Sequence, residues 1–324
     1  MNAPRTRVVR RPVHGVLLLD KPLGLSSNQA LQKAKWLLRA EKAGHTGTLD
    51  PLASGVLPLC FGAATKFSQG HLDADKTYQA TLRLGVTTTT GDAEGQVVAE
   101  RPVPPLAPEQ LEAVRQRFIG RITQVPPMHS ALKKDGKALY EYARQGVEVE
   151  RAPREVEIYE LNMAPTLAGQ ALEAIDIVVK CSKGTYIRTL GEDIGGALGC
   201  GGHLTALRRT ATGPFDIAQC TTLDALEAMD DDGRLRCLLP PESLVPAHEH
   251  VVLAGEEAGR FLAGMRRRGP WPDRGDVAVF GEQPHLFLGT AHIKAGELIP
   301  QRLLSPIELR QMAGVDQHEK KVAP

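Results

Sequence analysis

Two segments of this chain alternate between apolar and polar residues, and this pattern constrains the fold most strongly. Thr77 to Val86 places five apolar side chains on one face, namely Tyr78, Ala80, Leu82, Leu84 and Val86, and polar ones on the other. The segment Ile175–Cys181 alternates in the same way. Such alternation is typical of strands with one buried face, and it favours an antiparallel sheet over a doubly wound parallel one.

Helical spacing separates these strands. A short apolar run over 14–19 predicts a buried strand, and Ser26 or Ser27 then offers an N-cap before Ala30, Ala34 and Leu38. Two further helices are expected, one opened by Pro108 and one with Ile187, Leu190, Ile194 and Leu198 on its apolar face. The residues 204–210 form a short apolar-basic piece of undefined type. The predicted class is α/β (α+β), with strands and helices sharing one core.

The length of 324 residues suits one large domain and a small one. We expect a flexible basic arm over 1–12 and a main domain over 13–245. Weak periodicity and many charges indicate an exposed insertion at about 121–155. Closely spaced prolines indicate a linker over 236–249. Short β-like runs then predict a small β-rich module over 249–308, followed by a frayed tail over 309–324.

The overall charge does not indicate a nucleic-acid-binding protein, because 39 Lys and Arg residues face 38 Asp and Glu residues. Any RNA-binding charge must therefore be local, and each local run could equally be solvated surface. Three runs qualify: Arg5 to Arg11, Lys133 with Lys134 and Lys137, and Arg266 to Arg268.

The cysteine pattern and the lack of long apolar segments point to a reduced, cytoplasmic protein. Five widely spaced cysteines, without a C-x-x-C motif, argue against a disulfide framework and against a zinc site. We find neither the roughly 20 apolar residues that span a bilayer nor a secretory signal.

The glycine-rich segment 44–55 is too irregular for a helix or a strand, so we expect a shaped loop. Asp50 lies in this loop, and Pro51 restricts it to extended conformations. A rigid scaffold can present such a side chain to a cleft. An aspartate in a turn can also simply bond its own backbone, and the local sequence does not exclude this alternative.

Six motifs follow one another in a distinctive order along the chain. They are His14 to Pro22, Gly44 to Pro58, Asp75-Lys76-Thr77-Tyr78, Ser130 to Gly146, Ser182 to Arg188, and Leu204 to Thr210. In this order they resemble the motifs of the TruB family of pseudouridine synthases, and the resemblance is strong over about residues 14–215. The tail around Gly296-Glu297-Leu298-Ile299-Pro300 resembles the small PUA-type RNA-binding module of that family.

The resemblance implies the pseudouridine synthase fold, an α/β domain whose mixed, largely antiparallel central sheet is flanked by helices. It also implies that the chain isomerises one uridine in the T loop of tRNA, conventionally position 55. The bond from ribose C1′ to uracil N1 breaks, the base rotates, and it rejoins through C5. Nothing is oxidised and no group is lost, so no cofactor is expected. The target base must first leave the RNA fold, and bases in RNA loops are readily splayed out.

The resemblance also assigns roles to three residues. Asp50 is the catalytic carboxylate, acting either as a nucleophile at C1′ or in removing the C2′ proton; the sequence does not choose between the two. Arg188 is the cation that holds this carboxylate ionised, and its alternative role is that of a surface cation on a helix. Tyr78 is the third catalytic residue, against which uracil stacks and whose phenol could shuttle a proton, although it could also be an ordinary core tyrosine.

Further site residues are expected to bind the substrate. His45 matches the family residue that occupies the space the flipped base vacates. Tyr186 and Leu207 match residues lining the uracil pocket, with core packing as the alternative. Asp92 either supports Arg188 or makes a turn, and Lys133 lies in the insertion, where it could bind RNA phosphate.

Three rival functions remain open at this point. The chain could fold tRNA without catalysis, or it could be a glycosidase-like hydrolase that pairs Asp50 with Asp92. It could also be a guide-RNA-dependent synthase of the dyskerin type, although the insertion and the compact tail favour a stand-alone enzyme. The expected partner is the T-arm stem-loop of tRNA, with no membrane, no obligate protein partner and a monomeric chain.

Overall fold

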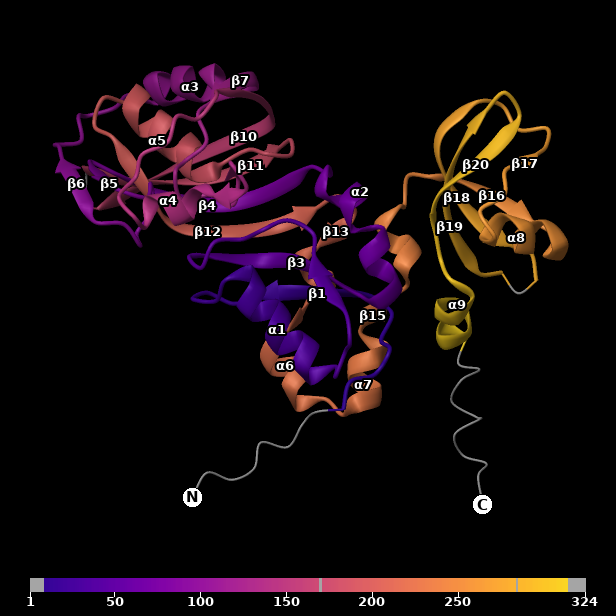
Figure 1. The fold of residues 1–324 in the computed structure, drawn as a ribbon. Helices are drawn as coiled ribbons and strands as arrows, with labels where there is room; N and C mark the ends of the chain where they lie inside the picture. Colours follow the sequence, from indigo (N-terminus) through magenta and orange to yellow (C-terminus); the bar gives the residue numbers. More distant parts are fainter. Residues whose placement is uncertain (1–8, 169–170, 284, 314–324) are drawn as a thin grey trace, which may run out of the picture.

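The computed structural model describes residues 9–168, 171–283 and 285–313. Its centre is a mixed sheet of eleven strands, shown in Figure 1. Only β1–β14 and β3–β12 are parallel pairs on the main path of the sheet, so the expected mixed, largely antiparallel α/β fold is confirmed. The path runs through β14 (Thr221–Thr222), β1 (Gly15–Lys21), β3 (Ala53–Phe61), β12 (Gly202–Thr212), β4 (Lys76–Leu84), β11 (Ala171–Cys181), β10 (Arg154–Ala168) and β7 (Gly120–Gln124).

The alternation in β4 separates core from solvent as predicted. Every second residue from Lys76 to Leu84 is buried, and the residues between them are more exposed. Helix α5 (Ile187–Ala197) covers this buried face with Leu190 and Ile194. Gly191 permits this close approach, because a Cβ at this position would lie only 3.0 Å from the Leu204 side chain. The start of α5 is thereby fixed over β4 and β12.

Helix α1 (Ser27–Leu37) begins where the sequence predicts. Ser26 is its N-cap and forms a capping box with Gln29, which satisfies amide groups that the first turn leaves unpaired. The buried face includes Ala30, Ala34 and Leu37.

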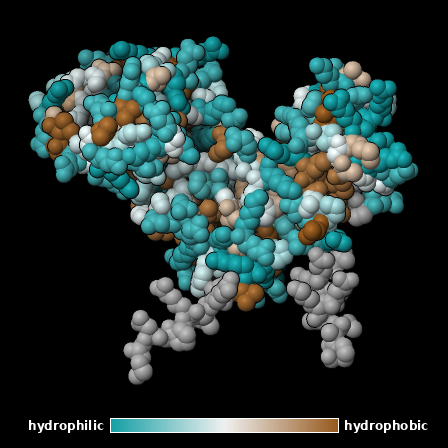
Figure 2. All heavy atoms as spheres, in the orientation of Figure 1, coloured by the Kyte–Doolittle hydropathy of each residue, from teal (hydrophilic) through white to brown (hydrophobic). Residues whose placement is uncertain are grey.

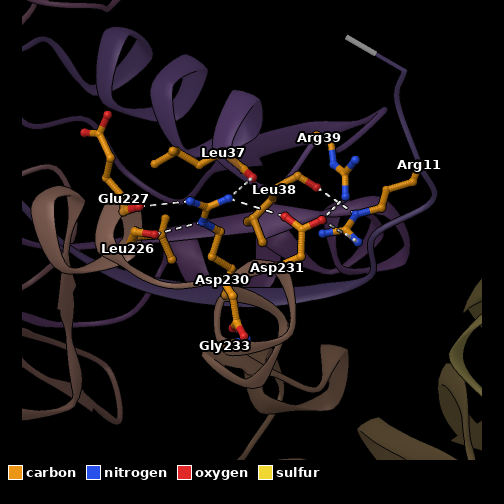
Figure 3. Close-up of polar contacts among 10 residues, drawn as sticks. Arg11, Leu37, Leu38, Arg39, Leu226, Glu227, Asp230, Asp231 and Gly233 are labelled. Carbon is orange, nitrogen blue, oxygen red and sulfur yellow. Dashed lines mark hydrogen bonds and ion pairs between the residues drawn. The ribbon is translucent and has the colours of Figure 1, made fainter.

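A cluster of charges ties the N-terminal segment and the C-terminal end of α1 to helix α7 (Asp231–Arg236), as Figure 3 shows. Asp231 forms ion pairs with Arg11, Arg39 and Arg234. Arg11 also donates to the Leu38 carbonyl, at 3.1 Å. The described end of the expected flexible arm, residues 9–12, is therefore bound to the fold, whereas 1–8 lie outside the described residues.

Two boundaries differ from the sequence-based expectation. The irregular loop is confined to residues 46–52, because β2 (Ala43–His45) and β3 flank it and pair with each other. Gly55 lies inside β3 at φ +104°, where a Cβ would meet the Arg209 carbonyl at 2.1 Å, so glycine here permits close strand packing rather than a loop. The insertion covers 125–153 rather than 121–155, because β7 and β10 belong to the sheet.

The apolar-basic piece at 204–210 is the middle of β12, a central strand of eleven residues. Its alternation is hidden by two register shifts against β4, between Leu204 and Ala206 and between Arg209 and Ala211. Each shift changes which side chains face the core, so a period of two cannot be followed along the sequence.

The C-terminal residues form a separate sheet of five strands that curls into a small β-rich unit. The strands are β16 (Glu249–Leu253), β18 (Arg274–Gly281), β19 (Phe287–Lys294), β20 (Glu297–Leu303) and β17 (Arg267–Arg268), with α8 (Gly255–Leu262) and α9 (Pro306–Met312) beside them. The expected frayed tail therefore begins with a helix, and 314–324 lie outside the described residues.

A shared hydrophobic cluster joins this unit to the back of the main sheet. Phe287 packs against Phe67 with the rings tilted by 59° and their centroids 4.9 Å apart, and both belong to a buried cluster that also contains Val16 and Leu18 of β1. Leu244 and Val245, in the expected linker, are buried in the same cluster. Lys66 adds an ion pair to Glu308 of α9 at 2.6 Å. The segment between the two sheets is therefore packed rather than free.

The remaining elements are short or lie at the edges. They include helices α2 (Ser68–Leu72), α3 (Pro108–Arg117), α4 (Leu139–Ala143) and α6 (Leu223–Ala228), and the 3-10 turns at Gly62–Lys66, Ile217–Gln219 and Pro241–Leu244. The short strands are β5 (Val86–Thr88), β6 (Val97–Glu100), β8 (Lys133–Lys134), β9 (Lys137–Ala138), β13 (Phe215–Asp216) and β15 (Leu238–Leu239). None of the helices in the described part of the chain has the length and apolar character needed to cross a membrane.

Candidate active site

The loop 46–52 is held in place from several sides. The Ser27 hydroxyl of α1 donates to the Leu49 carbonyl at 3.0 Å and accepts from the Leu49 amide at 2.8 Å. The Pro51 carbonyl accepts from the Gly24 amide at 2.9 Å, and the Asp50 carbonyl accepts from the Ala53 amide at 3.0 Å. These bonds fix the backbone on both sides of Asp50, so its carboxylate is presented by a rigid loop.

Arg188 meets this carboxylate from the first turn of α5. Its Nη2 atom lies 2.9 Å from Oδ2 of Asp50, and its side chain is only 5% exposed. On the other side, Nε lies 3.6 Å from Oδ2 of the buried Asp92. A guanidinium between two carboxylates is held by both charges, which fixes its direction.

Two backbone carbonyls complete the environment of Arg188. Nη1 donates to Thr90 at 2.9 Å, and Nη2 donates to His129 at 2.7 Å. His129 lies in the insertion, so the insertion contacts the arginine that pairs with Asp50. Burial raises the pKa of the Asp50 carboxyl, and the neighbouring Arg188 charge opposes that rise.

A cavity of about 500 Å³ opens beside this ion pair. Its lining includes Asp50 and Arg188 together with three other predicted site residues, Tyr78, Tyr186 and Leu207. Burial raises the pKa of both the Tyr78 and the Tyr186 phenols, so both are neutral hydrogen-bonding groups at neutral pH. A cavity that combines flat rings, an aliphatic side chain and a fixed carboxylate suits a planar polar ring attached to a sugar.

The other predicted site residues lie outside this cavity. Asp92 lines an adjoining hollow that also reaches Asp50 and Arg188. His45 lies in β2, half-buried, and burial lowers the pKa of its imidazole. Lys133 lies in β8 of the insertion and lines a different hollow, beside Arg151 and Arg154.

Three residues that the sequence analysis did not single out also belong to this region. Gln124 is 1% exposed, and its side chain forms two hydrogen bonds with the backbone of Tyr186. It donates to the Tyr186 carbonyl at 3.2 Å and accepts from the Tyr186 amide at 3.1 Å. Lys76 and Arg209 are buried cations that line the cavity itself. The sequence could have indicated Lys76 by its position, because it lies two residues before Tyr78 and therefore on the same face of the strand.

Comparison with known proteins identifies the family. The model of the TruB family pseudouridylate synthase N-terminal domain matches residues 35–187, and the model of the tRNA pseudouridylate synthase B C-terminal domain matches 188–246. A curated relative, tRNA pseudouridine synthase B of Verminephrobacter eiseniae, is 63% identical, and the match covers 96% of this chain and 94% of the relative. The chain belongs to the TruB family.

Further TruB relatives and solved structures agree with the fold. The tRNA pseudouridine synthase B of Ralstonia pickettii is 56% identical, with 91% of this chain and 95% of the relative covered. A third model, for the C-terminal part of pseudouridine synthase II TruB, matches residues 250–304. A chain from a crystal structure of a Cbf5-Nop10-Gar1 complex has a TM-score of 0.68 at 26% identity, covering 91% of this chain and 86% of that one.

Proposed function

We propose that this TruB-family chain isomerises a uridine of tRNA to pseudouridine, and that its target is the T-loop uridine at position 55 of tRNA numbering. The observation that carries the proposal is the contact of 2.9 Å between Arg188 and Asp50 at the wall of the cavity. This contact holds the Asp50 carboxyl group beside a space lined by Tyr78, Tyr186 and Leu207. The curated relatives that support this proposal are named tRNA pseudouridine synthase B.

In the proposed mechanism, Asp50 is the catalytic residue and acts at the ribose, as a nucleophile at C1′ or on the C2′ proton. Arg188 keeps the carboxylate ionised and directed, and Asp92 holds Arg188 from behind. Tyr78, Tyr186 and Leu207 contain the extruded uracil. His45 occupies the place that the base leaves in the RNA loop, and Lys133 binds phosphate from the insertion.

The proposal extends to the organisation of the chain. Residues 13–245 are the catalytic unit, with the insertion over the active site, and 249–308 are a PUA-like unit that binds RNA. The enzyme acts as a monomer on the T arm, in the cytoplasm, and requires no cofactor. The structural neighbour with a TM-score of 0.68 comes from a Cbf5-Nop10-Gar1 complex, whereas the 63% identical relative is named as a tRNA enzyme.

The direct test is tritium release from unmodified tRNA labelled as [5-³H]uridine, because isomerisation replaces the hydrogen at C5. We expect release of one tritium per tRNA, and none when the T-loop target is replaced by cytidine. Release that persists with the cytidine variant would move the target elsewhere in the tRNA. Free uracil in the products would instead indicate a hydrolase.

Salt should weaken tRNA binding steeply, because Lys and Arg side chains of the protein displace the counterions that surround the RNA phosphates. The face of the molecule in Figure 2 is mostly hydrophilic, and the insertion carries Lys133, Lys134 and Lys137 on exposed or half-buried positions. Lys133→Ala should lower the slope of log affinity against log salt concentration by about 1 if this lysine contacts one phosphate. Fluorescence anisotropy with a labelled T-arm stem-loop measures the slope.

Lys33→Ala is a matched control for this prediction. Lys33 is also a lysine at the surface, but it lies on α1, outside the insertion and the C-terminal unit, and it already pairs with Glu227 at 2.8 Å. An unchanged slope for Lys133→Ala would remove this lysine from the RNA interface. An equal drop in both variants would show a general effect of net charge rather than a local phosphate contact.

A further inference from the structure

Two buried cations line the cavity without a carboxylate partner. Arg209 is 1% exposed and Lys76 is 8% exposed. The two approach from adjacent strands, since the Cα partner of Arg209 in the pairing of β12 with β4 is Tyr78, two residues after Lys76. Among the described residues, no acidic group lies within ion-pair distance of either, whereas Arg188 in the same cavity has two such groups.

Both cations retain hydrogen-bond donors that the protein does not use. The Nε atom of Arg209 donates to the Val56 carbonyl at 2.7 Å, but its buried Nη2 atom has no partner. The Nζ atom of Lys76 donates to the carbonyls of Leu72 and Ala74, which leaves its third N–H. Burial lowers the pKa of Lys76 to about 8, so the ammonium remains charged at neutral pH.

The cavity as a whole carries an excess of positive charge. Lys76, Arg188 and Arg209 line it, against Asp50 as the one carboxylate among its lining residues in the described part of the chain. Removing unpaired charges from water is unfavourable, and here the fold does so twice within one site. Such an arrangement is preorganised for a negative charge that is absent from the free protein.

The proposed reaction creates such a charge. When the bond between C1′ and N1 breaks, both bonding electrons stay with uracil, and the negative charge spreads from N1 to the ring carbonyl oxygens. The charge disappears again when C5 bonds to C1′, and the net transfer of a proton from C5 to N1 then leaves the base neutral. The base is neutral before and after, so donors that favour the anion lower the barrier without tightening the binding of uridine.

We propose that Lys76 and Arg209 stabilise the negative charge on the uracil ring while it is detached from C1′. This inference rests on the proposed function and deepens it, because it assigns the charge stabilisation on the base side of the reaction to residues other than Asp50 and Arg188. The competing assignments are that the two cations bind an RNA phosphate, or that they only hold β4 and β12 together.

The test varies the stability of the detached base. Fluorine at C5 withdraws electrons, so 5-fluorouracil is a better leaving anion and needs less help from the protein. T-arm stem-loops carrying uridine or 5-fluorouridine at the target are mixed with saturating enzyme. The single-turnover rate is then followed as loss of the starting nucleoside, because C5 of the fluorinated base carries no proton that could be released. Liquid chromatography with mass spectrometry of digested RNA separates each starting nucleoside from its rearranged products, which for uridine have the same mass.

For Lys76→Met we expect the uridine rate to fall about 10²-fold and the 5-fluorouridine rate only about 10-fold, a size typical of losing one preorganised donor. The dissociation constant of the RNA should stay within about 2-fold, because uniform binding is not what the cation provides. Lys76→Arg keeps the charge and should restore most of the uridine rate. Arg209→Lys should shift the ratio of the two rates in the same direction as Lys76→Met.

Lys21→Met is the matched control. Lys21 is also fully buried, also donates to two carbonyls and also has its pKa lowered to about 8 by burial, but it does not line the cavity. Any cost to folding should therefore be similar. The Lys21 charge also acts on Asp50, which serves both substrates, so both rates should change together and their ratio should remain that of the wild type. Thermal denaturation of each variant verifies folding.

Equal slowing of both substrates in Lys76→Met would overturn the inference in favour of a structural role. Weaker RNA binding with an unchanged rate for bound RNA would overturn it in favour of a phosphate contact. If Lys76→Met does not fold, a wild-type ratio in Arg209→Lys overturns the inference by itself. Failure of the wild-type enzyme on both substrates would instead refute the proposed function, so the two failures are distinguishable.

Discussion

Asp50→Asn should abolish pseudouridine formation while leaving tRNA bound. The amide has nearly the same shape as the carboxylate and can stay in the loop that Ser27 holds. It can neither attack C1′ nor accept the C2′ proton, and it loses the charge that pairs with Arg188 at 2.9 Å. We expect tritium release to fall by on the order of 10⁴-fold or more, as for other residues that react directly with substrate.

The control is Asp232→Asn, an exposed aspartate on α7 for which we expect wild-type release. Equal release by wild type and Asp50→Asn would keep the isomerase but discard Asp50 as its centre. If neither protein releases tritium from well-folded tRNA, a protein that folds tRNA without catalysis becomes the better interpretation.

Arg188→Lys should slow the bound reaction by roughly 10²–10³-fold, the size expected when a preorganised charged contact is lost. The guanidinium contacts Asp50, Asp92 and the carbonyls of Thr90 and His129, which lie in different directions. A lysine ammonium is a single point charge and cannot make all of these contacts at once. Single-turnover kinetics at saturating enzyme measure the rate, and anisotropy measures RNA affinity, which should change by only a few-fold.

The same variant should also shift the pH profile. Burial raises the pKa of Asp50, the Arg188 charge opposes the rise, and only the ionised carboxylate reacts. Activity is therefore lost as the pH falls through the pKa of Asp50 in the folded protein. A displaced positive charge opposes the rise less, so the acid limb should move to higher pH. The control is Arg115→Lys, on the exposed helix α3, which should change neither the turnover rate nor the acid side of the pH profile. Normal turnover of Arg188→Lys would refute a role that requires the planar guanidinium group.

The sequence predicts the local elements of this fold better than their arrangement. Alternation places β4 and β11 correctly because each has one buried face, and the cap at Ser26 marks the start of α1. The order of strands depends on pairing between distant segments, which no local pattern reports. Strand β12 could not be recognised because its two register shifts break the period of two on which strand prediction depends.

In the candidate site as well, the sequence predicts some residues, and others become apparent only from the fold. The motifs around Asp50 and Arg188 name these two residues, and the fold brings them into contact. Lys76 and Arg209 were not singled out because charged side chains are normally assigned to solvent, and their burial depends on the packing of three strands. The position of Lys133 could not be predicted either, since the path of the insertion follows no period. Its side chain lies in a hollow separate from the cavity.

The hydrophobic cluster between the two sheets also bears on how this chain can be divided. Phe280, Phe287 and Leu304 of the C-terminal unit cover Val16 and Leu18 on the back of β1, two strands away from β12. A fragment ending at residue 246 would keep every residue of the cavity and yet expose the apolar underside of the sheet that supports it. Such a surface favours aggregation. Because the two sheets share this cluster, we expect the fragment to be much less soluble than the whole chain.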